Sequence, residues 1–143
     1  MIRRIGVQAV LPILISCGLT LSAQSQSGLF SRVISGPLVN DGKYSAGVCI
    51  VDFDGDGRND IYVVNTSGTS DRNALFRNAG SGTFEAVTGL PIVEDIAMGY
   101  GASWGDYDND GDLDVAVANF LGQASVLYVN TGDGSFTASM NGG

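Results

Sequence analysis

The sequence contains no histidine among its 143 residues, and it has only two cysteines and three prolines. Without histidine, catalytic triads, metal sites and acid–base chemistry that depend on imidazole are excluded. The two cysteines, Cys17 and Cys49, are too few for a dense disulfide scaffold or a cysteine-rich zinc site. Seven basic residues stand against 15 acidic ones, which gives a net charge of −8. This balance argues against a nucleic-acid-binding surface, which needs a basic stripe.

Glycine, by contrast, is abundant. The chain has 21 glycines, about twice the usual share of ~7%. Because 44% of the residues are hydrophobic, this composition indicates a turn-rich chain that folds rather than a disordered one. The length predicts a single domain, since domains hold roughly 100–200 residues.

The first 25 residues have the layout of a secretory signal peptide. Two arginines precede an apolar run over residues 5–21, and small polar residues follow. This order of positive, apolar and small polar segments is typical of a signal peptide. The run contains a proline and is too short for a clean membrane span of ~20 residues. We therefore expect cleavage after Ala23 or Ser25 and a secreted, extracellular or periplasmic protein.

Two other interpretations of this segment stay open. Residues 14–17, Leu-Ile-Ser-Cys, resemble a bacterial lipobox, in which Cys17 would become the lipidated first residue and tether the protein to the cell surface. The segment could instead form a buried N-terminal helix. If the signal peptide is simply removed, Cys49 is left as a small buried strand residue or a free thiol.

The rest of the chain repeats itself at an offset of 54 residues. Residues 47–65 align with 101–119, and residues 73–84 align with 125–136 after a deletion of two. On this alignment the chain divides into repeat 1 over residues 27–80, repeat 2 over residues 81–132, and the start of a truncated third repeat over residues 133–143.

Each repeat contains four short segments with the character of β-strands, rich in β-branched and aromatic residues and bounded by glycine turns. The predicted strands are 48–51, 61–64 and 74–77 in the first repeat and 102–104, 115–118 and 126–129 in the second, and the glycine turn at the end of each repeat leads into a fourth strand, from Thr83 and from Ser135. Four antiparallel strands per ~50 residues predict an all-β fold of β-propeller-type blades. A β-sandwich with two similar hairpins is the alternative. Trp104 and Tyr107 are expected to pack against the protein.

Nine of the 15 acidic residues lie in two loops that fit the pattern Asp-x-Asp-x-Asp-Gly-x-x-Asp. Carboxylates this close together repel one another unless a cation lies among them. In such a loop, positions 1, 3, 5 and 9 offer side-chain oxygens, position 7 offers its carbonyl, and glycine at position 6 permits a sharp turn. The candidate metal ligands are Asp52, Asp54, Asp56, Arg58 (through its backbone) and Asp60 in the first loop, and Asp106, Asp108, Asp110, Asp112 (through its backbone) and Asp114 in the second.

A set of hard oxygen ligands predicts calcium, with about one Ca²⁺ for each loop. Magnesium demands a tighter octahedral geometry, and the lack of histidine and thiolate ligands disfavours zinc and copper. An EF-hand is excluded, because position 12 would have to be glutamate, whereas Val63 and Val117 stand there in predicted strands. A solvated acidic turn without metal is the alternative.

These loops and the strands after them, residues 52–65 and 104–119, resemble the VCBS/FG-GAP repeat family, which includes the calcium-binding blades of integrin α-subunit propellers. Residues 75–88 resemble its cartilage-acidic-protein/ASPIC-UnbV branch in particular. The resemblance covers residues 28–143 and implies side-chain ligation by the aspartates at positions 1, 3, 5 and 9. The Phe-Gly and Gly-Ala-Pro clusters of the family and the C-terminal ASPIC-UnbV domain are not present in this sequence.

A closed propeller usually needs four to eight blades, so we expect an N-terminal fragment of a longer multi-blade protein, or several chains that form one ring. The expected function is that of a secreted or surface-tethered, non-catalytic module for adhesion or recognition, with structural calcium. Its blade loops would bind a protein or glycan but no nucleic acid, and membrane contact would come only through a lipid anchor at Cys17. The alternative is the propeller part of a polysaccharide lyase or hydrolase with its active site in missing blades. No catalytic residue is predicted, because the chain has no nucleophile–base constellation.

Overall fold

The computed structural model describes residues 32–40, 42–66 and 71–139. The predictions for residues 1–25 and for Cys17 lie outside the described residues. All elements named below belong to one compact unit, Val33–Gly143. Within the described part of the chain, no helix has the length and apolar character that a membrane crossing requires.

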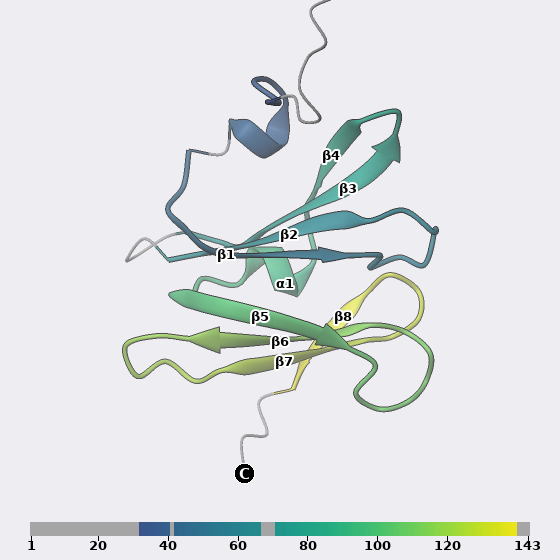
Figure 1. Cartoon of the computed structure of the whole chain (residues 1–143). Helices are drawn as coiled ribbons and strands as arrows, with labels where there is room; N and C mark the ends of the chain where they lie inside the picture. The colour runs from purple at the N-terminus through teal and green to yellow at the C-terminus, as the bar shows by residue number, and fades with distance from the viewer. Residues whose placement is uncertain (1–31, 41, 67–70, 140–143) are drawn as a thin grey trace, which may run out of the picture. The chain divides into compact units, whose positions relative to one another are not determined.

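Two antiparallel sheets of four strands each form the fold (Figure 1). The first sheet has the order β1-β2-β3-β4, with β1 Ser45–Val51, β2 Asp60–Asn65, β3 Ala74–Gly80 and β4 Thr83–Val87. The second has the order β5-β6-β7-β8, with β5 Gly99–Gly105, β6 Asp114–Asn119, β7 Val126–Asn130 and β8 Phe136–Ser139. The only helices among the described residues are η1 Pro37–Val39 and α1 Pro91–Glu94. The prediction of all-β blades with four antiparallel strands is therefore confirmed.

The two sheets share their register as well as their strand order. Val51 pairs with Asp60 at the end of the first hairpin, and Gly105 pairs with Asp114 at the same place in the second. Each first strand also shifts register at its start, before Gly47 in one sheet and before Gly101 in the other. Because the repeat offset carries over to backbone pairing, equivalent residues of the two sheets can be compared directly.

The fourth strand of each sheet follows a tight turn that begins near the repeat boundary. Gly80 and Gly82 have φ of 85° and 77°, and Gly132 and Gly134 have φ of 80° and 81°, conformations that side chains with a Cβ rarely adopt. These turns bring β4 beside β3 and β8 beside β7. The fourth strand of each sheet therefore comes from the sequence repeat that follows. β4 lies beyond residue 80, where repeat 1 ends, and β8 lies beyond residue 132, where repeat 2 ends.

The hydrophobic core lies between the two sheets. It is built from one face of each sheet, from the first acidic loop and from α1, and its members are Val51, Phe53, Tyr62, Val64, Leu75, Ile92, Val93, Val115, Val117, Tyr128 and Phe136. Burying each of these side chains contributes about 1.5–3 kcal/mol. This contact is what joins the two sheets into one unit.

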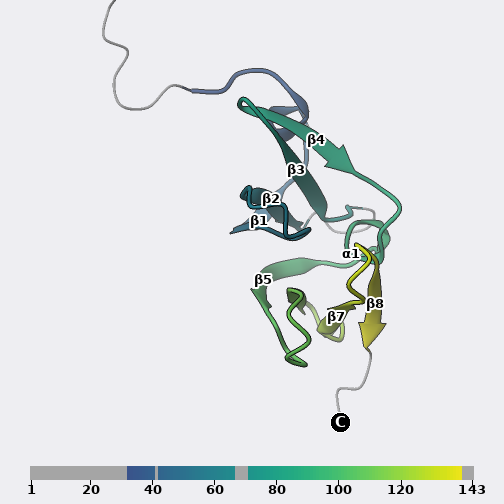
Figure 2. The same cartoon turned by 90° about the vertical axis from the view of Figure 1, so that its right-hand side faces the viewer.

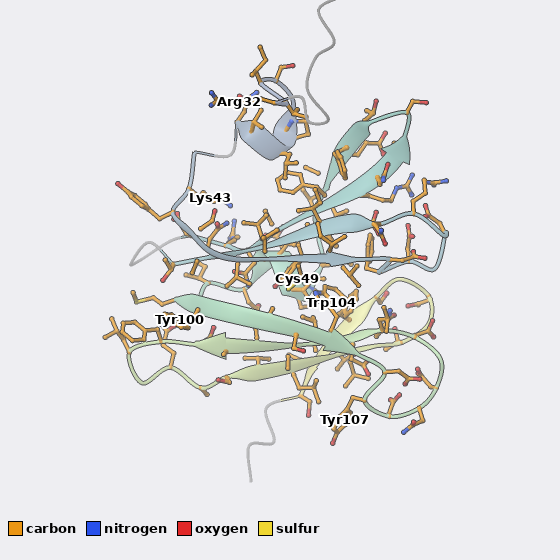
Figure 3. All side chains as sticks on the ribbon, viewed as in Figure 1. Arg32, Lys43, Cys49, Tyr100, Trp104 and Tyr107 are labelled. Carbon is orange, nitrogen blue, oxygen red and sulfur yellow. The ribbon has the colours of Figure 1, made fainter. Side chains whose placement is uncertain are left out.

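Aromatic side chains dominate the centre of this core. Trp104 meets the ring of Tyr62 edge-on at 5.5 Å and the ring of Phe136 edge-on at 6.0 Å, so the prediction that it packs is confirmed. The same prediction for Tyr107 is wrong, since Tyr107 is 68% exposed. Tyr107 belongs to the second acidic loop, and its side chain lies at the outer side of the second sheet rather than between the sheets (Figure 3).

The short helix α1 bridges the two sheets. Figures 1 and 2 both show it between them, and it contacts β3 of the first sheet and β8 of the second. Ile92 and Val93 are buried, and the carbonyl of Ile92 accepts a hydrogen bond of 2.9 Å from the hydroxyl of Tyr62. Pro91 stands at the first turn of the helix, where its missing N–H costs nothing.

The outer face of the first sheet is apolar and uncovered on β1. Val48 and Ile50 are 64% and 63% exposed. At the repeat offset they correspond to Ala102 and Trp104, which pack against the first sheet in the core. The same strand positions are therefore an interface in the second sheet and a free surface in the first.

Cys49 provides a probe of the contact between the sheets. Its Sγ donates a hydrogen bond of 3.3 Å to the carbonyl of Ala102, and burial raises the pKa of the thiol above its usual value. Because the thiolate is the nucleophile, we expect alkylation of Cys49 by iodoacetamide at pH 8 to be at least about tenfold slower in the folded protein than in urea. Peptide mass spectrometry separates Cys49 from Cys17, and equal rates in both states would contradict the packing described here.

Candidate metal centre

The first acidic loop connects β1 to β2 and is held by its own carboxylates. The backbone N–H groups of Asp56 and Gly57 donate to the two carboxylate oxygens of Asp52, at 3.0 and 2.9 Å. The carboxylates of Asp54 and Asp56 each accept an N–H from two positions further on, at 3.3 and 2.9 Å. Gly57 has a φ of 82°, so the sharp turn predicted at position six is confirmed.

This folding brings three carboxylates of the first loop together. Asp52, Asp54 and Asp56 each offer an oxygen, and these oxygens lie within 4.8 Å of one another. Calcium binds oxygen at 2.3–2.6 Å, so two of its ligands can stand up to about 5 Å apart. The spacing and the oxygen chemistry of this donor set therefore fit a calcium ion.

The second acidic loop, between β5 and β6, repeats this pattern. The N–H groups of Asp110 and Gly111 donate to the two carboxylate oxygens of Asp106, both at 3.1 Å. The carboxylate of Asp110 accepts the N–H of Asp112 at 2.9 Å. Gly111 has a φ of 101°, and Asn109 has a φ of 63°, which asparagine tolerates better than most residues. The two loops therefore share one backbone course.

The carboxylates that meet in the second loop are not all the equivalents of those in the first. Oxygens of Asp106, Asp108 and Asp114 lie within 4.8 Å of one another. The aspartates at positions 1 and 3 belong to the carboxylate cluster in both loops. The third member is the aspartate at position 5 in the first loop and the aspartate at position 9 in the second. The carboxylate of Asp112, at position 7, lies beside Gly132. A Cβ added to Gly132 would stand 2.9 Å from Oδ2 of Asp112.

The crowding of charge is evident at Asp108. The pKa of this carboxyl lies above its usual value, first through desolvation and then through the negative charges of Asp110, Asp114 and Asp106. Ionised carboxylates at this spacing repel one another, and a cation among them would remove the repulsion. The electrostatics of the second loop therefore favour a bound cation.

The aspartate at position nine has a structural task that the sequence analysis missed. Asp60 and Asp114 are 0% and 1% exposed. Asp60 accepts the backbone N–H groups of Phe53 at 3.1 Å and Asn78 at 2.7 Å. Asp60 thus ties its loop to β3, the third strand of its sheet. Burial raises the pKa of Asp60, and the two N–H donors oppose this shift.

The same bonds recur in the second sheet. Asp114 accepts the N–H of Tyr107 and the N–H of Asn130, at 2.7 and 2.8 Å. These donors are backbone N–H groups, which any residue except proline offers, so the sequence carries no specific signal for this role; the side chains of Asn78 and Asn130 donate instead to the carbonyls of Asn59 and Leu113, at 3.0 and 3.3 Å. Each buried carboxylate satisfies two backbone donors that would otherwise lack a partner.

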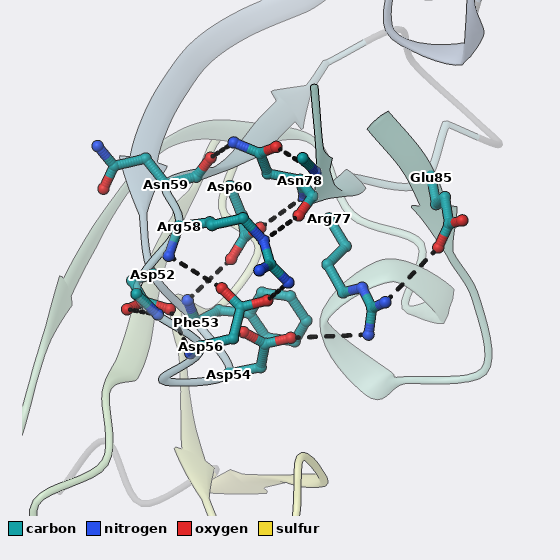
Figure 4. Close-up of polar contacts among 12 residues, drawn as sticks. Asp52, Phe53, Asp54, Asp56, Arg58, Asn59, Asp60, Arg77, Asn78 and Glu85 are labelled. Atoms are coloured by element: carbon teal, nitrogen blue, oxygen red, sulfur yellow. Dashed lines mark hydrogen bonds and ion pairs between the residues drawn. The ribbon is translucent and has the colours of Figure 1, made fainter. Parts of the chain in front are cut away.

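Position seven was predicted to offer a backbone carbonyl, from Arg58 in the first loop and Asp112 in the second, and that role stays a prediction. The structure shows what the side chain of Arg58 does. Its guanidinium pairs with the carboxylate of Asp56 and donates through Nε to the carbonyl of Asn78 at 2.8 Å (Figure 4).

Two β-blades, each with an aspartate-rich loop between its first and second strands, define a class of repeat protein, and a comparison of the sequence agrees with it. The family model of the FG-GAP-like repeat matches residues 52–117, which span both acidic loops. This match supports the resemblance to the FG-GAP family and suggests a β-propeller-like repeat module. No curated protein and no solved structure matches the chain.

Proposed function

We propose that this chain is a calcium-stabilised, non-catalytic module for recognition or adhesion, in which one Ca²⁺ closes the acidic loop of each blade. The observation that carries this proposal is the meeting of three carboxylate oxygens within 4.8 Å in each of the two loops. The residues that would hold the ions are Asp52, Asp54 and Asp56 in the first loop and Asp106, Asp108 and Asp114 in the second.

The role of the ion is structural. A ligand that binds only the folded state stabilises it by RT ln(1 + [L]/Kd), about 2.7 kcal/mol at a hundredfold excess over Kd. Extracellular calcium modules typically have Kd values of ~10⁻⁴–10⁻³ M. The loops would therefore be filled in the millimolar calcium outside the cell, which agrees with the secretion signal expected in residues 1–25.

The arrangement of the blades supports a propeller. Val48 and Ile50 are exposed on the first sheet, while their repeat equivalents Ala102 and Trp104 are interface residues of the second. A preceding blade that packed on β1 as the first sheet packs on β5 would cover them. We propose that the partner, a protein or a glycan, binds at the blade loops, and that the branch is that of the cartilage-acidic-protein/ASPIC-UnbV proteins.

A thermal melt tests the calcium role. In 5 mM Ca²⁺ we expect the melting temperature to exceed that in EGTA by about 10 °C, from the linkage above and a shift of roughly 4–8 °C per kcal/mol. Asp54→Ala and Asp108→Ala should each reduce this difference by removing one ligand from one loop. Circular dichroism at 218 nm follows the transition.

The control variant is Glu94→Gln, which removes a negative charge from α1, outside both loops. Its calcium-dependent shift should equal that of the wild type. A melting temperature that is the same in millimolar calcium and in EGTA would overturn the proposed function.

A further inference from the structure

The two acidic loops differ in charge although their backbones have the same hydrogen-bond pattern. The first has four aspartates and an arginine at position seven, Arg58, while the second has a fifth aspartate there, Asp112. On the third strand the first sheet carries Arg77, where the second carries Val129. Beyond Arg77 the sequence has nine acidic residues and no lysine or arginine.

Arg58 and Arg77 both face the carboxylates of the candidate centre (Figure 4). Arg58 pairs with Asp56 and is held in place by its bond to the carbonyl of Asn78. Arg77 lies with Nη1 3.9 Å from Oδ2 of Asp54 and with Nη2 3.7 Å from Oε2 of Glu85. Two of the three clustered carboxylates of the first loop therefore already have a guanidinium beside them.

The second loop has no such partner. Among the described residues, no ion pair involves an aspartate of the loop from Asp106 to Asp114. Its carboxylates are stabilised by backbone N–H donors alone. Within the part of the chain that the structure describes they have no cationic partner, so a cation from solution would neutralise them.

We propose that the two loops are unequal calcium sites, with the second as the tight site and Arg58 as the residue that weakens the first. This inference rests on the proposed calcium function. An ion that enters the first loop must separate Asp56 from Arg58 or share that carboxylate with it, and the guanidinium repels the ion. A unit positive charge about 6 Å from a divalent ion in water lowers affinity on the order of tenfold.

The difference assigns separate roles to the two blades. The first loop keeps its shape without metal, because Arg58 serves as its counter-ion. The second loop depends on the ion, and it fills first as calcium rises.

Calorimetric titration with calcium chloride tests the inference. We expect the wild type to show two classes of sites at least about tenfold apart in Kd. Asp108→Ala should remove the tighter class, and Asp54→Ala the weaker. Arg58→Asp, which gives the first loop the residue of the second, should tighten the weak class about tenfold or more. The reciprocal variant Asp112→Arg should weaken the tight class by a similar factor.

Two further variants keep the test decisive if a charge swap disturbs folding. Arg58→Gln removes the guanidinium without adding a carboxylate, and Arg77→Val copies the residue of the second sheet. Both should tighten the weak class, and near-ultraviolet circular dichroism of Trp104 checks that each variant is folded.

The outcomes separate this inference from the function on which it rests. Two equal sites in the wild type, a tighter first loop, or a weak class that Arg58→Gln leaves unchanged would each overturn the inference while calcium binding itself stands. If neither loop bound calcium at 10 mM, the proposed function would be overturned, and the inference with it.

Discussion

Replacing Tyr62 with alanine is expected to lower the free energy of unfolding by about 3–5 kcal/mol, the range for deleting a large buried aromatic side chain. Tyr62 is fully buried between the sheets, and its ring meets Trp104 edge-on. Its hydroxyl donates to the carbonyl of Ile92 at 2.9 Å and accepts from Nδ2 of Asn73 at 2.8 Å. One side chain thus joins β2, α1 and the second sheet, and urea unfolding followed by Trp104 fluorescence measures its loss.

Tyr62→Phe is the matched control for this substitution. It keeps the ring and removes only the hydroxyl, so the buried amide of Asn73 and the carbonyl of Ile92 each lose a partner. We expect a cost of about 1–3 kcal/mol, the penalty for an unsatisfied buried polar group. If the alanine variant were no less stable than the phenylalanine variant, the ring would not be a core residue and the packing of the two sheets would be contradicted.

Asp114→Ala is expected to cost about 3 kcal/mol even with calcium removed by EGTA. The backbone N–H groups of Tyr107 and Asn130 would lose their acceptor, and each unsatisfied buried donor costs about 1–3 kcal/mol. Urea unfolding in EGTA measures this cost without any contribution from the metal. The prediction separates the hairpin-anchoring role of Asp114 from its proposed role as a calcium ligand.

Asp108→Ala in EGTA is the control, since it removes the same charge from an exposed position of the same loop. Its free energy of unfolding should stay within about 0.5 kcal/mol of the wild type, because the mutual repulsion of the carboxylates falls as one of them is lost. Equal losses in the two variants would mean that the buried hydrogen bonds of Asp114 carry no stability of their own.

Much of the fold could be predicted from local patterns. The alternation of β-branched residues with glycine turns placed all eight strands, and the structure moves their ends by only a few residues, as from 48–51 to Ser45–Val51. The helix at Pro91–Glu94 was not predicted, because four residues are too short for a periodic signal. It forms because Ile92 and Val93 are buried against both sheets.

The candidate site could be predicted as two loops but not as two sets of clustered side chains. The pattern treats Asp56 and Asp110 as equivalent, yet only Asp56 joins the carboxylate group of its loop, and Asp114 joins that of the other. The orientation of a carboxylate depends on its neighbours in space, among them Arg58, which pairs with Asp56 and has no counterpart in the second loop.

The repeat, the position of each strand and the two aspartate loops follow from local sequence alone, because these features arise from neighbouring residues and from the turns that glycine permits. Packing in three dimensions decided which face of each sheet is core and made Asp60 and Asp114 the anchors of their hairpins on the third strand. It also decided that the first loop carries its own counter-ion. These features depend on contacts between residues that are distant in the chain, such as Asp60 with Asn78 and Tyr62 with Trp104, and no local pattern encodes them.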